Sequence, residues 1–176
     1  MIFSGVQAFA GYGHRKQRAA VRAVYHNNIR RQGGQEDKGM AAVTELIRTE
    51  ADGSISFGNH LLEEKSKKEG FESGGNEYKV KTCHELTRLE RNGMFVYESV
   101  PGTAVENLKV TEDTLSFVVS GDADAQFTVE LEADTEYTVY IDDVNAGRMK
   151  TNLSGKLSVS TALNGNAGVK VKIVRA

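Results

Sequence analysis

Apolar and polar residues alternate with a period of two from Met40 to the end of the chain. This period is typical of β-strands that bury one face and expose the other. Short turn signals interrupt the alternation, among them Asp52-Gly53, Gly74-Gly75 and Asn92-Gly93, and such dipeptides favour tight hairpins. The pattern therefore predicts an all-β domain over residues 40–176.

The alternating segments predict about eleven or twelve short strands. In chain order they are residues 43–48, 54–58, 77–82, 85–90, 94–98, 104–110, 114–120, 125–132, 137–142, 156–161 and 169–174, with 145–150 as a short additional strand. Only Leu61–Glu69 departs from the pattern, because it is charged and places Glu64 and Lys68 at the spacing of a helical pair. We therefore expect at most one short helix and an antiparallel β-sandwich, similar to immunoglobulin and fibronectin III domains.

One local segment supports this architecture. Leu131–Val139 resembles the tyrosine corner of fibronectin type III and related sandwiches, although those domains usually have proline where Ala133 stands. The resemblance implies that the ring of Tyr137 packs in the core while its hydroxyl bonds the backbone near the preceding turn. Such a corner stabilises a fold and carries no activity.

The charge is unevenly distributed. Residues 1–39 have a net charge of +5 and the remainder a net charge of −7, within a total of −2. A basic arm on an acidic body suits an RNA- or membrane-seeking tail, but no nucleic-acid motif is present and we do not expect such binding. The alternative is that Met40 is the natural start, since Gln35-Glu36-Asp37 can be encoded by a purine-rich ribosome-binding sequence. Residues 1–39 are then translated upstream sequence; if the arm is genuine, we expect it to lie outside the core and to be poorly ordered.

Composition excludes several classes of protein. The single cysteine, Cys83, excludes an internal disulfide and a thiolate zinc cluster. The chain has no run of 18 apolar residues, so no membrane span is predicted. Residues 1–11 lack the features of a signal peptide. We expect a cytoplasmic protein, with a surface location or secretion by a non-classical route left open.

Histidine and cysteine offer little for catalysis. Cys83 and His84 are adjacent in a strand-like run, so their side chains are expected on opposite faces. His60 is distant in sequence, and His14 and His26 fall in the basic segment. These residues have no metal-ligand spacing. We assign no catalytic, cofactor-binding or metal-binding residues.

Two acidic segments are candidates for calcium ligands: Asp142-Asp143 with Asn145, and Asp122 with Asp124. Calcium requires six or more oxygens, and the EF-hand pattern is absent. Asp, Asn and Gly are also the residues that hairpin turns prefer. The segments are therefore interpreted as turns, and no cofactor is expected.

Aromatic residues suggest one further site. The candidates for a stacking platform that binds a sugar are Tyr78, Phe95, Tyr97 and Tyr140. Burial of these residues in the core would exclude such a platform. Core packing is expected for most of them, because aromatic usage is only 7%. Asn152-Leu153-Ser154 matches a glycosylation sequon, which has meaning only in a secreted protein.

Three blocks carry a family resemblance that covers essentially residues 40–176. Thr44–Asn59, Asn92–Val105 and Tyr140–Ser158 resemble a group of small clostridial proteins that carry the name endosialidase. Cleavage of sialic acid requires clustered arginines and an acid–base pair. After Met40 the arginines are scattered over different predicted strands, at Arg48, Arg88, Arg91, Arg148 and Arg175, and the chain has no tryptophan. A sialidase-type hydrolase is therefore not expected.

The sequence favours a non-enzymatic structural, assembly or interaction protein that acts through its surface or its exposed sheet edges. Its expected partners are further copies of itself or another protein. A carbohydrate-binding accessory module of a polysaccharide-active system is the alternative, with a glycan as its partner.

Overall fold

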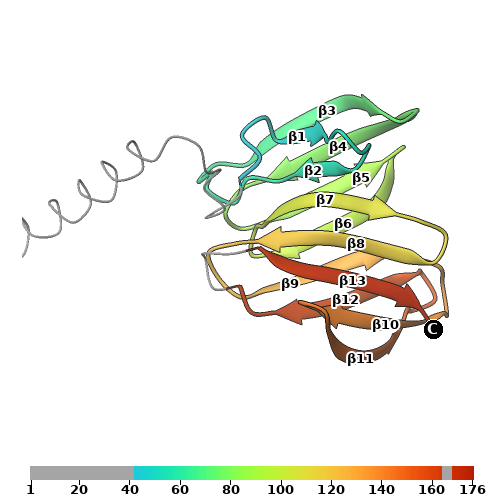
Figure 1. Ribbon diagram of the computed structural model, residues 1–176. Coiled ribbons are helices and arrows are strands. Elements are labelled where there is room, and N and C mark those ends of the chain that lie inside the picture. Colours follow the sequence, from blue (N-terminus) through green and yellow to red (C-terminus); the bar gives the residue numbers. More distant parts are fainter. Residues whose placement is uncertain (1–41, 164–167) are drawn as a thin grey trace, which may run out of the picture. The chain divides into compact units, whose positions relative to one another are not determined.

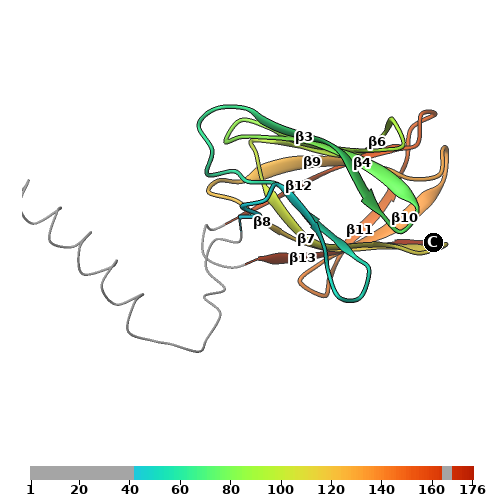
Figure 2. The same ribbon diagram turned by 90° about the horizontal axis from the view of Figure 1, so that it is seen from above.

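The computed structural model describes residues 42–163 and 168–176, which form thirteen β-strands and no helix (Figure 1). The strands lie in two antiparallel sheets, and Figure 2 shows the sheets edge on as two layers. The predicted antiparallel β-sandwich is therefore confirmed. The basic segment 1–39 and Met40 lie outside the described residues. In the described part of the chain, no helix has the length and apolarity to cross a membrane.

The larger sheet has seven strands and the smaller has six. In spatial order, the seven-stranded sheet contains β1 (Ile47–Thr49), β2 (Ile55–Phe57), β7 (Ala104–Val110), β8 (Thr114–Ser120), β13 (Val169–Arg175), β10 (Glu136–Ile141) and β11 (Val144–Lys150). The six-stranded sheet contains β12 (Lys156–Thr161), β9 (Ala125–Glu130), β6 (Met94–Val100), β5 (Thr87–Arg91), β4 (Asn76–Thr82) and β3 (Ser66–Ser73).

Aromatic side chains from both sheets meet at the centre of the core. Tyr97 on β6 is fully buried, and its ring centroid lies 5.4 Å from that of Phe57 and 5.7 Å from that of Phe117, both on the opposite sheet. Both pairs have edge-to-face geometry, which the aromatic quadrupole favours. Phe127 of the neighbouring strand β9 stacks on Tyr97 at 6.0 Å. Tyr97 thus links the two layers.

The one short helix that Leu61–Glu69 could have formed is absent from the described residues, because Ser66–Ser73 forms strand β3 and pairs with β4. An i,i+4 ion pair contributes only a few tenths of a kcal/mol to a helix, whereas pairing with β4 also packs the half-buried Phe71 against the core. The apolar alternation that reveals other strands is missing here, since no residue of this edge strand is fully buried and Phe71 is its one large apolar side chain. A bulge with Gly70 at φ 66° further breaks the period.

The first strand is also shorter than predicted. Residues 43–46 form a turn in which the Leu46 N–H donates to the Val43 carbonyl, 2.9 Å away. Leu46 has a φ of 71°, which a strand does not accommodate. Val43 is nonetheless buried, and its N–H donates to the Gly58 carbonyl. The packed body therefore includes Val43, close to its predicted beginning.

The tyrosine corner is present. Tyr137 is only 6% exposed, and its hydroxyl accepts a hydrogen bond from the Glu132 N–H at 3.2 Å. Glu132 lies in the connection between β9 and β10, so the contact fixes the crossing from the six-stranded to the seven-stranded sheet. The contact forms with Ala133 in place of the usual proline.

We predict that Tyr137→Phe lowers the free energy of unfolding by about 1 kcal/mol, because one partly buried hydrogen bond is lost while the ring remains. Urea denaturation followed by circular dichroism measures the change. Tyr140→Phe is the matched control, since Tyr140 is half-buried and forms no side-chain hydrogen bond with other described residues. Equal stability of Tyr137→Phe and the parent protein would contradict a stabilising corner.

Candidate interaction edge

The fold brings His60 beside Asp122. The two residues are 62 positions apart, so the sequence pattern does not predict this contact. His60 is 2% exposed, and its Nδ1 lies 3.2 Å from Asp122 Oδ2. A catalytic dyad would need the opposite nitrogen to face substrate. Nε2 is instead buried and has no hydrogen-bond partner among the described residues. The pair therefore anchors the loop after β8 and leaves no nitrogen for a substrate to reach.

Cys83 and His84 lie in the connection between β4 and β5. Cys83 is buried with 2% exposure, whereas the side chain of His84 is 54% exposed. The two residues lie in a bend rather than in a strand, so the alternation of a strand does not set their side-chain directions. A thiol that is buried is not accessible for nucleophilic attack.

The acidic segments form turns. Asp142 and Asp143 have φ values of 47° and 65°, and they form the two-residue connection of the β10–β11 hairpin. Asp142 Oδ1 accepts the Lys170 N–H, and Asn145 Oδ1 accepts the Gly147 N–H, each at 2.8 Å. The backbone therefore engages oxygens that calcium would need.

Asp124 is used in the same way, since its Oδ1 accepts the Leu163 N–H at 3.1 Å. Within the described ranges, no three acidic, histidine or cysteine side chains are grouped as metal ligands would be.

The four candidate aromatics do not form one platform. Tyr78 and Tyr97 are buried in the core, whereas Phe95 and Tyr140 are half-buried, so core packing holds for two of the four rather than for most. Phe95 is on β6 of the six-stranded sheet, and Tyr140 is on β10 of the seven-stranded sheet. Lys156 Nζ also lies 4.1 Å from the ring centroid of Phe95. A stacked sugar would have to displace this cation from the ring.

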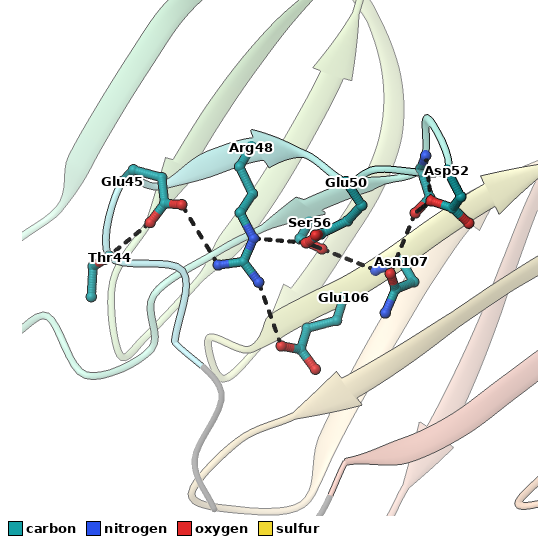
Figure 3. A network of polar contacts seen from close by, with 9 residues as sticks. Thr44, Glu45, Arg48, Glu50, Asp52, Ser56, Glu106 and Asn107 are labelled. Carbon is teal, nitrogen blue, oxygen red and sulfur yellow. Dashed lines mark hydrogen bonds and ion pairs between the residues drawn. The ribbon is translucent and has the colours of Figure 1, made fainter. Parts of the chain in front are cut away.

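Arg48 and Arg88 each form ion pairs with two or more carboxylates, and Arg175 pairs with Glu132 at 2.5 Å. Figure 3 shows Arg48 facing three of them: Glu45 at 3.6 Å, Glu50 at 2.7 Å and Glu106 at 3.8 Å. The Ser56 hydroxyl and then Arg48 hold the pKa of Glu50 below its ordinary value.

Arg88 is paired with Glu90 at 3.0 Å and Glu98 at 3.2 Å. Arg91, Arg148 and Arg175 lie on β5, β11 and β13. Arg48 and Arg88 therefore have their guanidinium groups committed to internal carboxylates.

A chain of buried hydroxyls closes one end of the sandwich beside Tyr97. The Tyr97 hydroxyl lies 2.8 Å from Thr103 Oγ1, and Ser99 Oγ lies 2.7 Å from the same atom. Thr87 Oγ1 donates to the Thr103 carbonyl and lies 2.8 Å from Thr82 Oγ1. All five residues are buried, so these polar groups satisfy one another without water.

A shallow depression lies at the other end of the sandwich, where hairpins connect the strands. It has a volume of about 450 Å3, and its lining includes Met94, Phe95 and Val110. Met94 and Val110 are 64% and 51% exposed. Its charged lining consists of Arg91 with Glu112, Glu130 and Glu132.

The sheet edges distinguish one side of the molecule from the other. On the side of β1 and β3, the two edge strands are tied together by a hydrogen bond of 2.7 Å from Thr49 Oγ1 to Ser73 Oγ. Strand β1 has only three residues, and β3 carries Lys67, Lys68 and Glu69 together with its bulge. Short, charged or bulged edges resist pairing with another chain.

Strand β11 is also protected. In its pairing with β10, Val139 is opposite Gly147 and Tyr140 is opposite Asn145, so Ala146 is an extra residue. This bulge bends the strand, and Arg148 and Lys150 add charge beyond it.

Strand β12 has none of these protective features. All six residues from Lys156 to Thr161 pair with β9 in one unbroken register. The strand contains no proline and no acidic residue. Its one charge, Lys156, reaches the Phe95 ring on β6, two strands into the sheet. The ammonium group is therefore directed away from the free edge.

The backbone groups on that edge can be assigned from one hydrogen bond. The Leu131 N–H donates to the Gly155 carbonyl at 2.7 Å, so alternation directs the backbone of Leu157, Val159 and Thr161 toward β9. The N–H and C=O groups of Ser158 and Ser160 then face outward. No other described strand lies beside them.

Comparison with known proteins identifies no relative of this chain. A scan against protein-family models and searches of curated proteins and solved structures find no match to this chain. The resemblance to the endosialidase-named group therefore remains an expectation from the sequence, and the function has to be argued from the edge itself.

We predict that the stability of the protein falls between pH 10 and 12 because of Tyr97. Burial raises the pKa of its hydroxyl to about 12, against an ordinary value of 10.0, although Thr103 and Ser99 partly offset this effect. The unfolded chain loses the proton first as pH rises, so the free energy of unfolding decreases by up to about 1.4 kcal/mol per pH unit.

Denaturation of the parent protein and Tyr97→Phe across this range tests the assignment. The variant is less stable near neutral pH by about 1 kcal/mol, and its disadvantage shrinks as the pH rises. Parallel losses in the two proteins would show that Tyr97 is not the titrating group.

Proposed function

We propose that this protein is a non-enzymatic assembly module that associates through the free edge of β12. The observation that carries the proposal is the contrast among the four sheet edges. Strands β1, β3 and β11 are short, charged or bulged, whereas β12 presents six regularly paired residues and the outward backbone groups of Ser158 and Ser160. An edge of this kind binds a strand by continuing the sheet.

The chemistry of the candidate catalytic groups supports a non-enzymatic role. His60 has a buried Nε2, Cys83 is buried, and Arg48 and Arg88 are held by carboxylates. None of these four groups is presented to a substrate. A sialidase-type hydrolase and a carbohydrate-binding module would each need side chains presented to substrate, whereas edge pairing needs only backbone.

Apolar surface lies on the same side of the molecule. Leu153 in the turn before β12 is 86% exposed, and Val144 at the start of β11 is 69% exposed. These are the most exposed large hydrophobic side chains among the described residues. Burial of apolar surface contributes roughly 25 cal/mol per Å2, so this side gains more from association than the tied side of β1 and β3.

We predict that the protein self-associates and that Ser160→Pro makes it monomeric. Proline removes an N–H that faces the free edge and none that bonds β9, so the sandwich itself retains its pairing. Ser160→Thr is the matched control, because it keeps the N–H and has high strand propensity.

Size-exclusion chromatography with light scattering, over a range of protein concentrations, measures the effect. Circular dichroism confirms that both variants fold. A parent protein that is monomeric at every concentration, or one that binds a defined glycan on an array as a monomer, would overturn the proposal.

A further inference from the structure

We infer that the occupant of the β12 edge is a second copy of β12, antiparallel to the first, with Val159 on the two-fold axis. This inference rests on the proposed function and specifies its partner and register. It follows from two constraints: which backbone groups are free and which side chains face the core.

Side-chain direction limits the possible registers. Leu157, Val159 and Thr161 are 2%, 3% and 8% exposed and face the core, while Ser158 and Ser160 are exposed on the outer face. A strand that continues the sheet must keep core-facing residues opposite core-facing residues, since a shift of one residue reverses every side chain. For two antiparallel copies of β12, the residue on the axis is then opposite itself, and Ser158 and Val159 are the central choices.

Free backbone groups decide between these two registers. With Ser158 on the axis, Lys156 would have to exchange hydrogen bonds with Ser160 of the second copy. Both groups of Lys156 are already engaged, because its N–H donates to Asn152 Oδ1 at 2.9 Å and its carbonyl accepts the Asn152 N–H at 3.0 Å. This register would break bonds that the folded chain already has.

With Val159 on the axis, no existing bond is broken. Ser158 of each copy is opposite Ser160 of the other, so the two pairs exchange four backbone hydrogen bonds using only the groups that face outward. On the core side, Val159 meets its own equivalent and Leu157 meets Thr161, which extends the apolar row of the six-stranded sheet.

Charge permits this arrangement without deciding the register. Lys156 is the one charged residue of β12, and in this register it is opposite position 162 of the second copy. The two ammonium-bearing residues then lie about 20 Å apart along the strands, at roughly 3.3 Å per residue, which exceeds the screening length at physiological salt. With Ser158 on the axis the separation would be about 13 Å, which also exceeds this length.

The arrangement also gives a closed dimer rather than an open chain of copies. A two-fold contact uses the same edge on both copies, and the remaining edges β1, β3 and β11 carry the protective features described above. Two six-stranded sheets join into one continuous sheet, and the assembly ends at two copies.

Cysteine cross-linking tests the register. We would prepare Ser158→Cys and Ser160→Cys separately and treat each dimer with a short bis-maleimide. With Val159 on the axis, the two introduced thiols of either variant are offset by two residues and lie about 8 Å apart. Both variants should therefore cross-link with yields within about twofold of each other. The parent protein is the control, because its Cys83 is buried.

Other outcomes contradict the inference in distinguishable ways. Cross-linking of Ser158→Cys about tenfold above that of Ser160→Cys would place Ser158 on the axis, since the two thiols of Ser160→Cys would then lie about 14 Å apart. Dimers that are lost in Ser160→Pro but cross-link at neither position would keep the edge and refute the antiparallel pairing. A monomeric parent protein in the light-scattering experiment would instead refute the proposed function.

Discussion

The packing of Tyr97 is the interaction on which the two layers depend. Its ring touches Phe57 and Phe117 from the opposite sheet, while its hydroxyl belongs to the buried group that includes Ser99 and Thr103. An aromatic ring supplies large apolar area, but a buried hydroxyl without a partner costs more than its hydrogen bond returns. The chain meets both demands at one position, so the same residue holds the sheets together and fixes the connection after β6.

The side chains of the core are buried between the two sheets, so the proposed association with another chain uses the sheet edges. The side with β1 and β3 is joined by the Thr49–Ser73 hydrogen bond and stiffened by the ion pairs of Arg48. The opposite side ends in β11, which is bulged, and in β12, which is regular. The proposed function accordingly uses backbone geometry at a sheet edge rather than a pocket lined with reactive groups.

Much of the architecture could be predicted from the sequence, because alternation and turn residues are local signals. Asp142-Asp143 predicted a turn, and the segment around Tyr137 predicted a corner that the Glu132 contact confirms. Strand β3 was missed because an exposed edge strand has no apolar face to reveal it. The His60–Asp122 contact joins distant loops, and a single sequence carries no signal for such a pair.

The β12 edge could be anticipated only in general terms. Alternation places a strand at residues 156–161, but it does not show whether that strand is central or at an edge. The position of Lys156 over Phe95 depends on the order β12-β9-β6, which is a property of the assembled sheet. Protection of an edge, or its absence, is thus decided by neighbours that local patterns do not identify.

Asn152 has a consequence of a different kind. In the sequence it belongs to a triplet associated with sugar attachment, yet its side-chain oxygen holds the N–H groups of both Ser154 and Lys156. Because this oxygen accepts the N–H of Lys156, the first residue of β12, a side chain outside the strand limits how many backbone groups of β12 are free to bind another chain. Natural variation at this position would therefore alter the length of a recognition surface, although no atom of Asn152 belongs to that surface.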